Sequence, residues 1–257
     1  KWHLGVEEHC LPNKRGFDYQ YGFYEAYSLY QPDLKDSNII NQHHDDFSDP
    51  HIWKGARKGN CALRCNNVVV EDSVYLTQRL ADEAVQFIER NQDSSFFLYV
   101  PFSAPHTPFQ ITREYYDRFP NEPDRNKRVY YGMIASLDDA VGEILDALKE
   151  RGLEENTMIW FLSDNGGATY TRATDNYPLK GGKFTNFEGG LNVPMMLQWK
   201  GHLPAESQFK SPVISMDIFQ TTAEISGIEL PKDRPFDGVN LLPYLLQDQK
   251  KAPHEAL

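Results

Sequence analysis

The chain has 257 residues, of which 40% are hydrophobic and 25% charged, values typical of a globular protein with one sizeable core. Its net charge of −11 argues against a nucleic-acid partner, because nucleic-acid-binding proteins usually carry a basic stripe. No run of apolar residues is long enough to cross a membrane, so we expect no membrane span.

The first 70 residues are rich in Gly, Pro, Asn, Asp and aromatic residues without a sustained period, which predicts long ordered loops over a core. Three cysteines leave at least one thiol unpaired. The spacing of Cys61 and Cys65 fits both a disulfide and two ordinary buried thiols, so the pairing stays open. The polar residues His43, His44, Asp45 and Asp46 resemble a metal cluster in composition, but we interpret them as an exposed polar loop.

Apolar residues from position 74 onward recur every three or four positions and predict an amphipathic helix that ends near Arg90. A short apolar run at 96–100 follows, which is typical of a strand buried on both faces of a parallel sheet. The pattern then repeats, with a helix over 129–148 ended by Gly152, strands at 158–162 and 193–199, and a helix over 214–225 closed by Gly227.

Alternating strands and helices predict an α/β fold with a mostly parallel central sheet flanked by helices. In such folds the ligand lies beyond the carboxyl ends of the strands. The loops after the first two predicted strands are therefore the candidate site, and both are polar: Ser-Ala-Pro-His-Thr-Pro at 103–108 and Ser-Asp-Asn-Gly-Gly at 163–167.

Asp164 and Asn165 place a carboxylate and an amide carbonyl side by side, and oxygens of this kind suit calcium or magnesium. The same Asp-Asn-Gly-Gly sequence is also strong turn chemistry, and by itself it favours a turn. Two adjacent residues supply at most about three of the six or more oxygens that calcium needs, so further ligands must come from elsewhere.

Three other candidates are weak when each is taken alone. His106 lies between two prolines, and a structural or surface histidine fits that position as well as a catalytic one. Lys183 precedes a mixed polar segment, where a solvated lysine is the ordinary reading. Lys1 and His3 alternate with Trp2, so in a strand or a tight loop both side chains would point to one side.

In combination, these segments resemble the sulfatase family, which belongs to the alkaline phosphatase superfamily. The resemblance covers essentially the whole chain, including 13–18, 75–81, 216–222 and 236–241. Its main motifs are Lys-Trp-His-Leu-Gly at 1–5, Ala-Pro-His-Thr-Pro at 104–108, Ser-Asp-Asn-Gly-Gly at 163–167, Gly-Lys at 182–183, Glu-Gly-Gly at 188–190 and Val-Pro at 193–194.

The resemblance implies an alkaline phosphatase/sulfatase-like fold and a sulfuric ester hydrolase that uses one calcium ion. It assigns Asp164 and Asn165 to the metal. Lys1 and His3 would contact the nucleophile and the sulfate. His106 and Lys183 would bind the sulfate oxygens and the bridging oxygen of the leaving group. Such cationic groups stabilise the charge that builds on the leaving oxygen, and a histidine can protonate it.

The chain departs from the family pattern at its start. The family's formylglycine, made from the cysteine of a Cys-x-Pro-x-Arg motif, and two further metal carboxylates lie upstream of the motif at residues 1–5. We therefore expect residues 1–257 to form a single but partial, truncated catalytic domain, without the nucleophile strand and the C-terminal subdomain, and by itself inactive. Cys10 is not a substitute, because Lys14 stands where the motif needs arginine and the order along the chain is wrong.

The sequence leaves two alternative functional hypotheses open. One is a phosphoester or phosphonate hydrolase of the same superfamily, which shares the scaffold and metal ligands. The other is a non-catalytic sulfatase-like protein. The substrate, a sulfated small molecule or a sulfated glycan, is not specified by the residues. The resemblance is compatible with a periplasmic, secreted or lysosomal location and does not choose among them.

Overall fold

The computed structural model describes residues 1–43, 49–246 and 251–255. It divides into two compact units, which are described separately. Unit 1 comprises residues 1–154 and 161–196, and unit 2 comprises residues 155–160 and 197–257. All six residues of the expected site belong to unit 1. His44, Asp45 and Asp46, interpreted above as a polar loop, lie outside the described residues.

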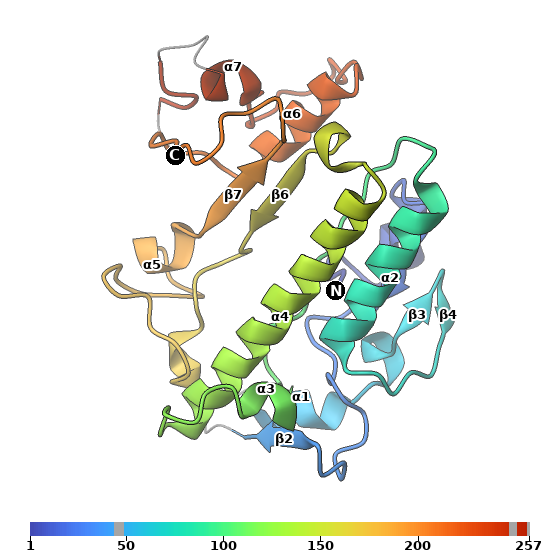
Figure 1. Ribbon diagram of the computed structural model, residues 1–257, viewed down its shortest axis with the longest axis vertical. Coiled ribbons are helices and arrows are strands. Elements are labelled where there is room, and N and C mark those ends of the chain that lie inside the picture. Colours follow the sequence, from blue (N-terminus) through green and yellow to red (C-terminus); the bar gives the residue numbers. More distant parts are fainter. Residues whose placement is uncertain (44–48, 247–250, 256–257) are drawn as a thin grey trace. The chain divides into compact units, whose positions relative to one another are not determined.

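Unit 1 holds most of the regular structure, and Figure 1 labels its helices and strands. Its helices are α1 (Asp49–Gly55), α2 (Leu76–Asn91), α3 (Arg113–Tyr116), α4 (Arg125–Glu150) and α5 (Glu188–Leu191), and its strands are β1 (Tyr21–Gly22), β2 (Ile39–Gln42), β3 (Arg64–Cys65), β4 (Val68–Val69) and β5 (Phe109–Thr112). Strands β6 (Ile159–Leu162) and β7 (Met195–Gln198) cross the boundary, and unit 2 adds α6 (Asp217–Ile225) and α7 (Leu242–Leu245).

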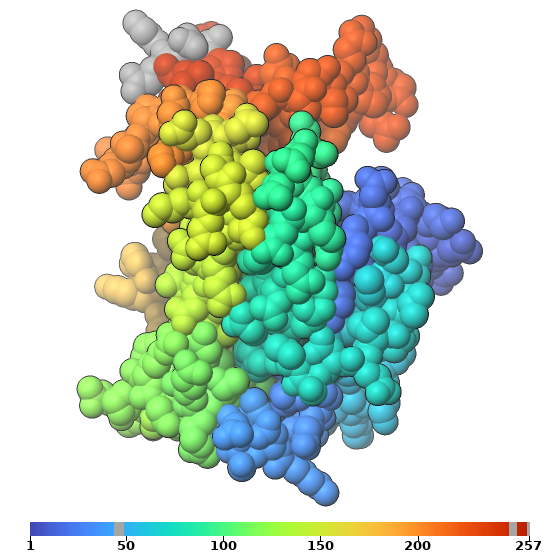
Figure 2. Space-filling model, turned by 45° about the vertical axis from the view of Figure 1, so that its right-hand side comes forward, coloured from blue at the N-terminus to red at the C-terminus, as the bar shows by residue number. Residues whose placement is uncertain are grey.

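The two long helices of unit 1, α2 and α4, pack against each other and form adjacent bands on one face of the molecule (Figure 2). Each buries the apolar stripe that its sequence period predicts, including Leu80 in α2 and Met133 in α4. The side chain of Asp124 caps α4 by accepting hydrogen bonds from two backbone N–H groups of the first turn. Gly152 ends α4 with a φ of +66°, as predicted, because this left-handed conformation is easiest for glycine.

The strand pairs in the described residues are short and antiparallel. Strand β1 pairs with β3 and β3 with β4, while β2 pairs with β5 in a register that joins Ile39 to Thr112. Strand β6 pairs with β7, and the backbone N–H of Ser163 donates to Pro194 O, which joins the end of β6 to the start of β7. That bond requires the two strands to run in opposite directions. The α/β class is confirmed, whereas the predicted parallel pairing is not found among the described pairs.

The predicted strand at 96–100 is wrong in the described part of the chain. These residues form no strand, and Phe97 and Tyr99 are 60% and 54% exposed. The apolar run gives the segment a tendency to be buried, but a strand also needs a neighbouring strand for its backbone groups, and no described segment pairs with this one. Strands β6 and β7 form where expected, although their side chains are only partly buried.

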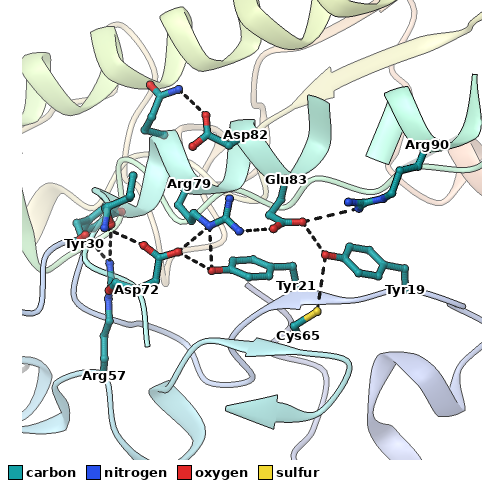
Figure 3. A network of polar contacts seen from close by, with 12 residues as sticks. Tyr19, Tyr21, Tyr30, Arg57, Cys65, Asp72, Arg79, Asp82, Glu83 and Arg90 are labelled. Atoms are coloured by element: carbon teal, nitrogen blue, oxygen red, sulfur yellow. Dashed lines mark hydrogen bonds and ion pairs between the residues drawn. The ribbon is translucent and has the colours of Figure 1, made fainter. Parts of the chain in front are cut away.

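A polar network ties β1 to α2 (Figure 3). The guanidinium of Arg79 forms ion pairs with Asp72, at 2.6 Å, and with Glu83. The hydroxyl of Tyr21 donates to Asp72 and that of Tyr19 donates to Glu83. Because all of these groups are partly or wholly buried, the network fixes the segment around β1 against the helix.

The three cysteines are free thiols, which settles the alternative left open for Cys61 and Cys65. No helix among the described residues is long and apolar enough to cross a membrane.

Candidate active site

The segment at residues 1–3 is held by backbone hydrogen bonds to the residues that follow β1. The N–H of Trp2 donates to Phe23 O and that of His3 donates to Tyr24 O, both at 2.9 Å. The backbone nitrogen of Lys1 lies 2.9 Å from Pro101 O, in the segment that leads to His106. The segment is not a continuous strand, because His3 has a φ of +54°. These contacts bring Lys1 to the loop at 101–108.

The ring of His106 is held in one tautomer. Its Nδ1 lies 2.7 Å from the carbonyl oxygen of Thr107, and a carbonyl only accepts, so Nδ1 carries the hydrogen. The backbone of His106 is fixed as well, because its N–H donates to Ser103 O and its carbonyl accepts from the hydroxyl of Tyr30. In the neutral ring Nε2 is therefore an unprotonated acceptor.

The turn at 163–167 leaves its oxygen ligands available. The hydroxyl of Ser163 donates to Asn165 O, and the Nδ2 of Asn165 donates to Gly166 O at 2.9 Å. The Oδ1 of Asn165 accepts no hydrogen bond from any residue that the structure describes. The carboxylate of Asp164 forms no hydrogen bond or ion pair within the described ranges and is exposed. The segment can therefore form a turn and still offer oxygen atoms to a metal ion.

Glycines place this turn directly against the loop that carries Lys183. A Cβ added to Gly166 would lie 1.7 Å from Gly189 O, and one added to Gly182 would lie 2.4 Å from Gly167 O. A Cβ on Gly190 would lie 2.6 Å from Gly182 O. Two backbone segments can approach this closely only without side chains, which explains the glycine pairs of both motifs.

Asn176 is a residue of this region that sequence reasoning missed. Its side-chain Oδ1 accepts from the N–H of Gly167 at 2.9 Å, and its Nδ2 donates to the carbonyls of Gly167 and Gly181. The N–H of Lys183 also donates to Gly167 O. Asn176 therefore joins the turn of Asp164 to the loop of Lys183. Its position in a polar loop gives no sequence signal for that role.

The charges of the site influence one another. Burial lowers the pKa of Lys1, which Asp164 raises and Lys183 lowers further. Burial also lowers the pKa of Lys183, while Asp164 raises it. For His3, burial and Lys1 lower the pKa. The structure therefore brings Lys1, His3, Lys183 and Asp164 within electrostatic reach of one another. Tyr99 is a further neighbour that the sequence did not reveal, since burial and then Asp164 raise its pKa.

Burial, followed by the positive charges of Lys183 and Lys1, lowers the pKa of His106 to about 4. Because an unfolded histidine titrates near 6.5, protonation of His106 favours the unfolded chain. The resulting stabilisation is fully present above pH 6.5 and is lost as the pH falls toward 4.

We expect His106 to make the free energy of unfolding of the metal-free chain fall by about 2 to 3 kcal/mol between pH 7 and pH 4. Urea titrations in EDTA measure this, with His106→Gln as the comparison. The variant should lose less stability than the wild type over the same range. Equal pH slopes for the two proteins would show that His106 titrates normally.

The donor set fits part of a calcium site. Asp164 and Asn165 offer hard oxygens, and neither has its free oxygen occupied by another described group. Among the described residues, no group of three or more His, Cys, Asp or Glu side chains could hold a metal ion. A calcium ion needs about six oxygens, so these two residues could supply only part of its coordination shell.

Known proteins resemble this chain over most of its length. The sulfatase family model matches residues 1–228. An uncharacterized sulfatase of Escherichia coli K12, YdeN, is 31% identical over 97% of this chain and 40% of its own length. The mouse N-acetylgalactosamine-6-sulfatase is 32% identical over 97% of this chain and 46% of its own length. The chain thus spans less than half of these curated relatives.

Solved structures are similar over nearly the whole chain. The crystal structure of Ps i-CgsB in complex with k-i-k-neocarrahexaose superposes with a TM-score of 0.85 at 35% identity, covering 98% of this chain and 55% of that one. The PsFucS1 sulfatase from Pseudoalteromonas sp. gives a TM-score of 0.74 at 28% identity, covering 98% and 52%. With the motifs in one site and the family model over most of the chain, the chain belongs to the sulfatase family and has its alkaline phosphatase-like fold.

Proposed function

We propose that the protein hydrolyses sulfate esters of glycans with the aid of a calcium ion. The observation that carries this proposal is the convergence of Lys1, His106 and Lys183 around the exposed carboxylate of Asp164 in unit 1. Two lysines and a histidine beside hard oxygen ligands suit an anionic ester, in a chain whose net charge would otherwise repel it.

Lys1 and Lys183 bind the sulfate oxygens. Both are half-buried, so their charges are less screened than those of exposed lysines and act more strongly on a bound anion. Negative charge increases on the bridging oxygen as the sulfur–oxygen bond breaks. A lysine held toward that oxygen stabilises the transition state more than the bound substrate.

His106 moves a proton at Nε2. The contact with Thr107 keeps the hydrogen on Nδ1, so Nε2 gains a proton only when the ring becomes cationic. In the free site the low pKa keeps the ring neutral. A sulfate bound beside the ring adds negative charge, which raises the pKa and allows Nε2 to take up a proton that it then donates to the leaving oxygen.

Asp164 and Asn165 would hold the calcium ion, which supplies Lewis-acid polarisation of the sulfate when it is bound. The nucleophile expected from the family resemblance is a formylglycine, and we assign that role to none of the described residues. The glycine contacts and Asn176 keep the metal-binding turn at a fixed place relative to Lys183.

The glycan class is supported by what several relatives are named for. One structural neighbour, Ps i-CgsB, is in complex with k-i-k-neocarrahexaose, and several curated relatives are N-acetylgalactosamine-6-sulfatases. We extend to this chain only their common chemistry, a sulfate ester on a sugar ring.

Calcium dependence tests the proposal in the longest natural polypeptide that contains residues 1–257. We expect sulfate release from galactose 6-sulfate to stop in EDTA and to return with calcium, and Asp164→Ala to raise the calcium concentration needed for half-maximal activity by at least about tenfold, as expected for an outright metal ligand. Asp175→Ala, an exposed aspartate in the same region, is the matched control. Full activity of Asp164→Ala in EDTA would refute the metal role.

A further inference from the structure

An exposed aromatic pair lies beside Lys183. The ring of Phe184 stacks on that of Tyr170, with centroids 5.6 Å apart and an interplanar angle of 18°. Phe184 is 75% exposed, so Tyr170 covers only part of the ring and most of it is open to water. The Nζ of Lys183 lies 5.5 Å from the centre of the Phe184 ring. A ligand held by this lysine therefore comes within reach of the ring.

The backbone at Phe184 is strained. Its φ of +73° falls in the left-handed region, which a bulky side chain rarely adopts and which glycine adopts freely. A large residue in this conformation is usually kept for packing or for function. Packing does not account for Phe184, because its side chain is mostly exposed.

We propose that Phe184, supported by Tyr170, is a platform for the sugar ring whose sulfate is bound by Lys183. This inference rests on the proposed function and adds a subsite to it. The face of an aromatic ring is electron-rich, whereas the axial C–H groups of a pyranose carry a small positive charge, so the two surfaces attract each other as they stack. In a sugar sulfate, one ester linkage separates the sulfate group from the sugar ring. A sulfate bound by Lys183 therefore places its sugar close to the Phe184 ring, whose centre is 5.5 Å from the lysine Nζ.

The surroundings favour a sugar over a wholly apolar ring system. A sterol gains most from an enclosed apolar pocket, but this platform is open to water. Exposed polar side chains flank both aromatic residues along the chain, namely Thr169 before Tyr170 and Asn186 after Phe184. A pyranose has an apolar face and hydroxyl groups at its edge, and it can use both kinds of surface at once.

The test compares Phe184→Gly and Phe184→Ala in the longest natural polypeptide that contains the chain. Both remove the ring, but only glycine also relieves the positive φ, so Phe184→Gly should unfold at the same temperature as the wild type or higher. We expect both variants to raise KM for galactose 6-sulfate by about three- to tenfold, with kcat unchanged. The affinity for inorganic sulfate should not change, since the ring does not touch it.

Leu191→Ala, an exposed apolar residue at the end of α5, is the control and should leave KM unchanged. Unchanged KM in both Phe184 variants would overturn the platform while leaving the sulfatase activity intact. An effect on phenyl sulfate but not on galactose 6-sulfate would also overturn it, because the occupant would then be an aromatic leaving group. A KM increase in only one of the two Phe184 variants would overturn the platform as well, because it would show that the effect comes from the backbone conformation and not from loss of the ring.

If the wild type releases no sulfate from any ester, the proposed function fails, and saturation-transfer NMR with galactose 6-sulfate then decides the platform by itself. The platform would be supported if saturation passes from the wild-type protein to the sugar C–H protons but does not do so in Phe184→Gly. Equal transfer in the two proteins, or none in the wild type, would overturn it.

Discussion

Replacing Lys183 by alanine is expected to lower kcat/KM for sulfate esters by about 10²- to 10³-fold, the usual loss when one preorganised group facing developing charge is removed. Lys183 is half-buried, its backbone is fixed by the bond from its N–H to Gly167 O, and its charge reaches His106. The variant loses the cation but keeps the glycine contacts that shape the loop. Steady-state kinetics on p-nitrophenyl sulfate, in the longest natural polypeptide that contains the chain, measure the effect.

Lys180 provides a matched control three residues earlier. It is exposed, and its Nζ lies 4.4 Å from the centre of the Phe187 ring. Lys180→Ala should change kcat/KM little, whereas Lys183→Arg should keep part of the activity because it retains the charge. Equal losses in Lys180→Ala and Lys183→Ala would show that Lys183 contributes only general positive charge.

Replacing Gly166 by alanine is expected to destabilise the chain by about 3 kcal/mol or more, at the upper end of overpacking effects. The new Cβ would meet the carbonyl oxygen and carbon of Gly189 at 1.7 and 2.7 Å, and a backbone group cannot turn away as a side chain can. The turn of Asp164 would have to separate from the loop of Lys183. Urea unfolding of the 257-residue chain, followed by circular dichroism, measures the loss.

Gly142 is the control for the same chemical change. It lies inside α4, and a Cβ added there meets nothing within 4 Å. Gly142→Ala should therefore stabilise the chain slightly, by about 0.5 to 1 kcal/mol, because alanine favours the helix. A Gly166→Ala protein as stable as the wild type would show that the two loops are not in contact as described.

The helices of this fold could be predicted from the sequence because their signals are local. The three- and four-residue period located α2 and α4, and Gly152 marked the end of α4. Strands depend on partners that are distant in sequence, and this is where the prediction failed. The apolar run at 96–100 has the composition of a buried strand, but no described segment pairs with it. The antiparallel direction of β6 and β7 is likewise a property of their contacts rather than of their residues.

In the candidate site, too, local signals could be predicted from the sequence, whereas contacts between distant segments could not. Residue type and motif order predict Asp164, Asn165, His106 and Lys183 as site residues. The structure places them close to one another and to Lys1. The sequence could not reveal the bonds of Asn176, because an asparagine in a polar loop is ordinarily part of a turn. Nor could it reveal the reason for the glycine pairs or the positive φ of Phe184, since both depend on segments that meet only in the folded chain.

We propose that this site acts on sulfate rather than phosphate esters, and a matched pair of substrates distinguishes the two. The kcat/KM values for p-nitrophenyl sulfate and p-nitrophenyl phosphate are measured with calcium in the longest natural polypeptide that contains residues 1–257. We predict a clear preference for the sulfate ester, and a lower kcat/KM for that ester in Lys183→Ala. A preference for the phosphate ester, or turnover of neither compound together with no release of sulfate from galactose 6-sulfate, would contradict the account.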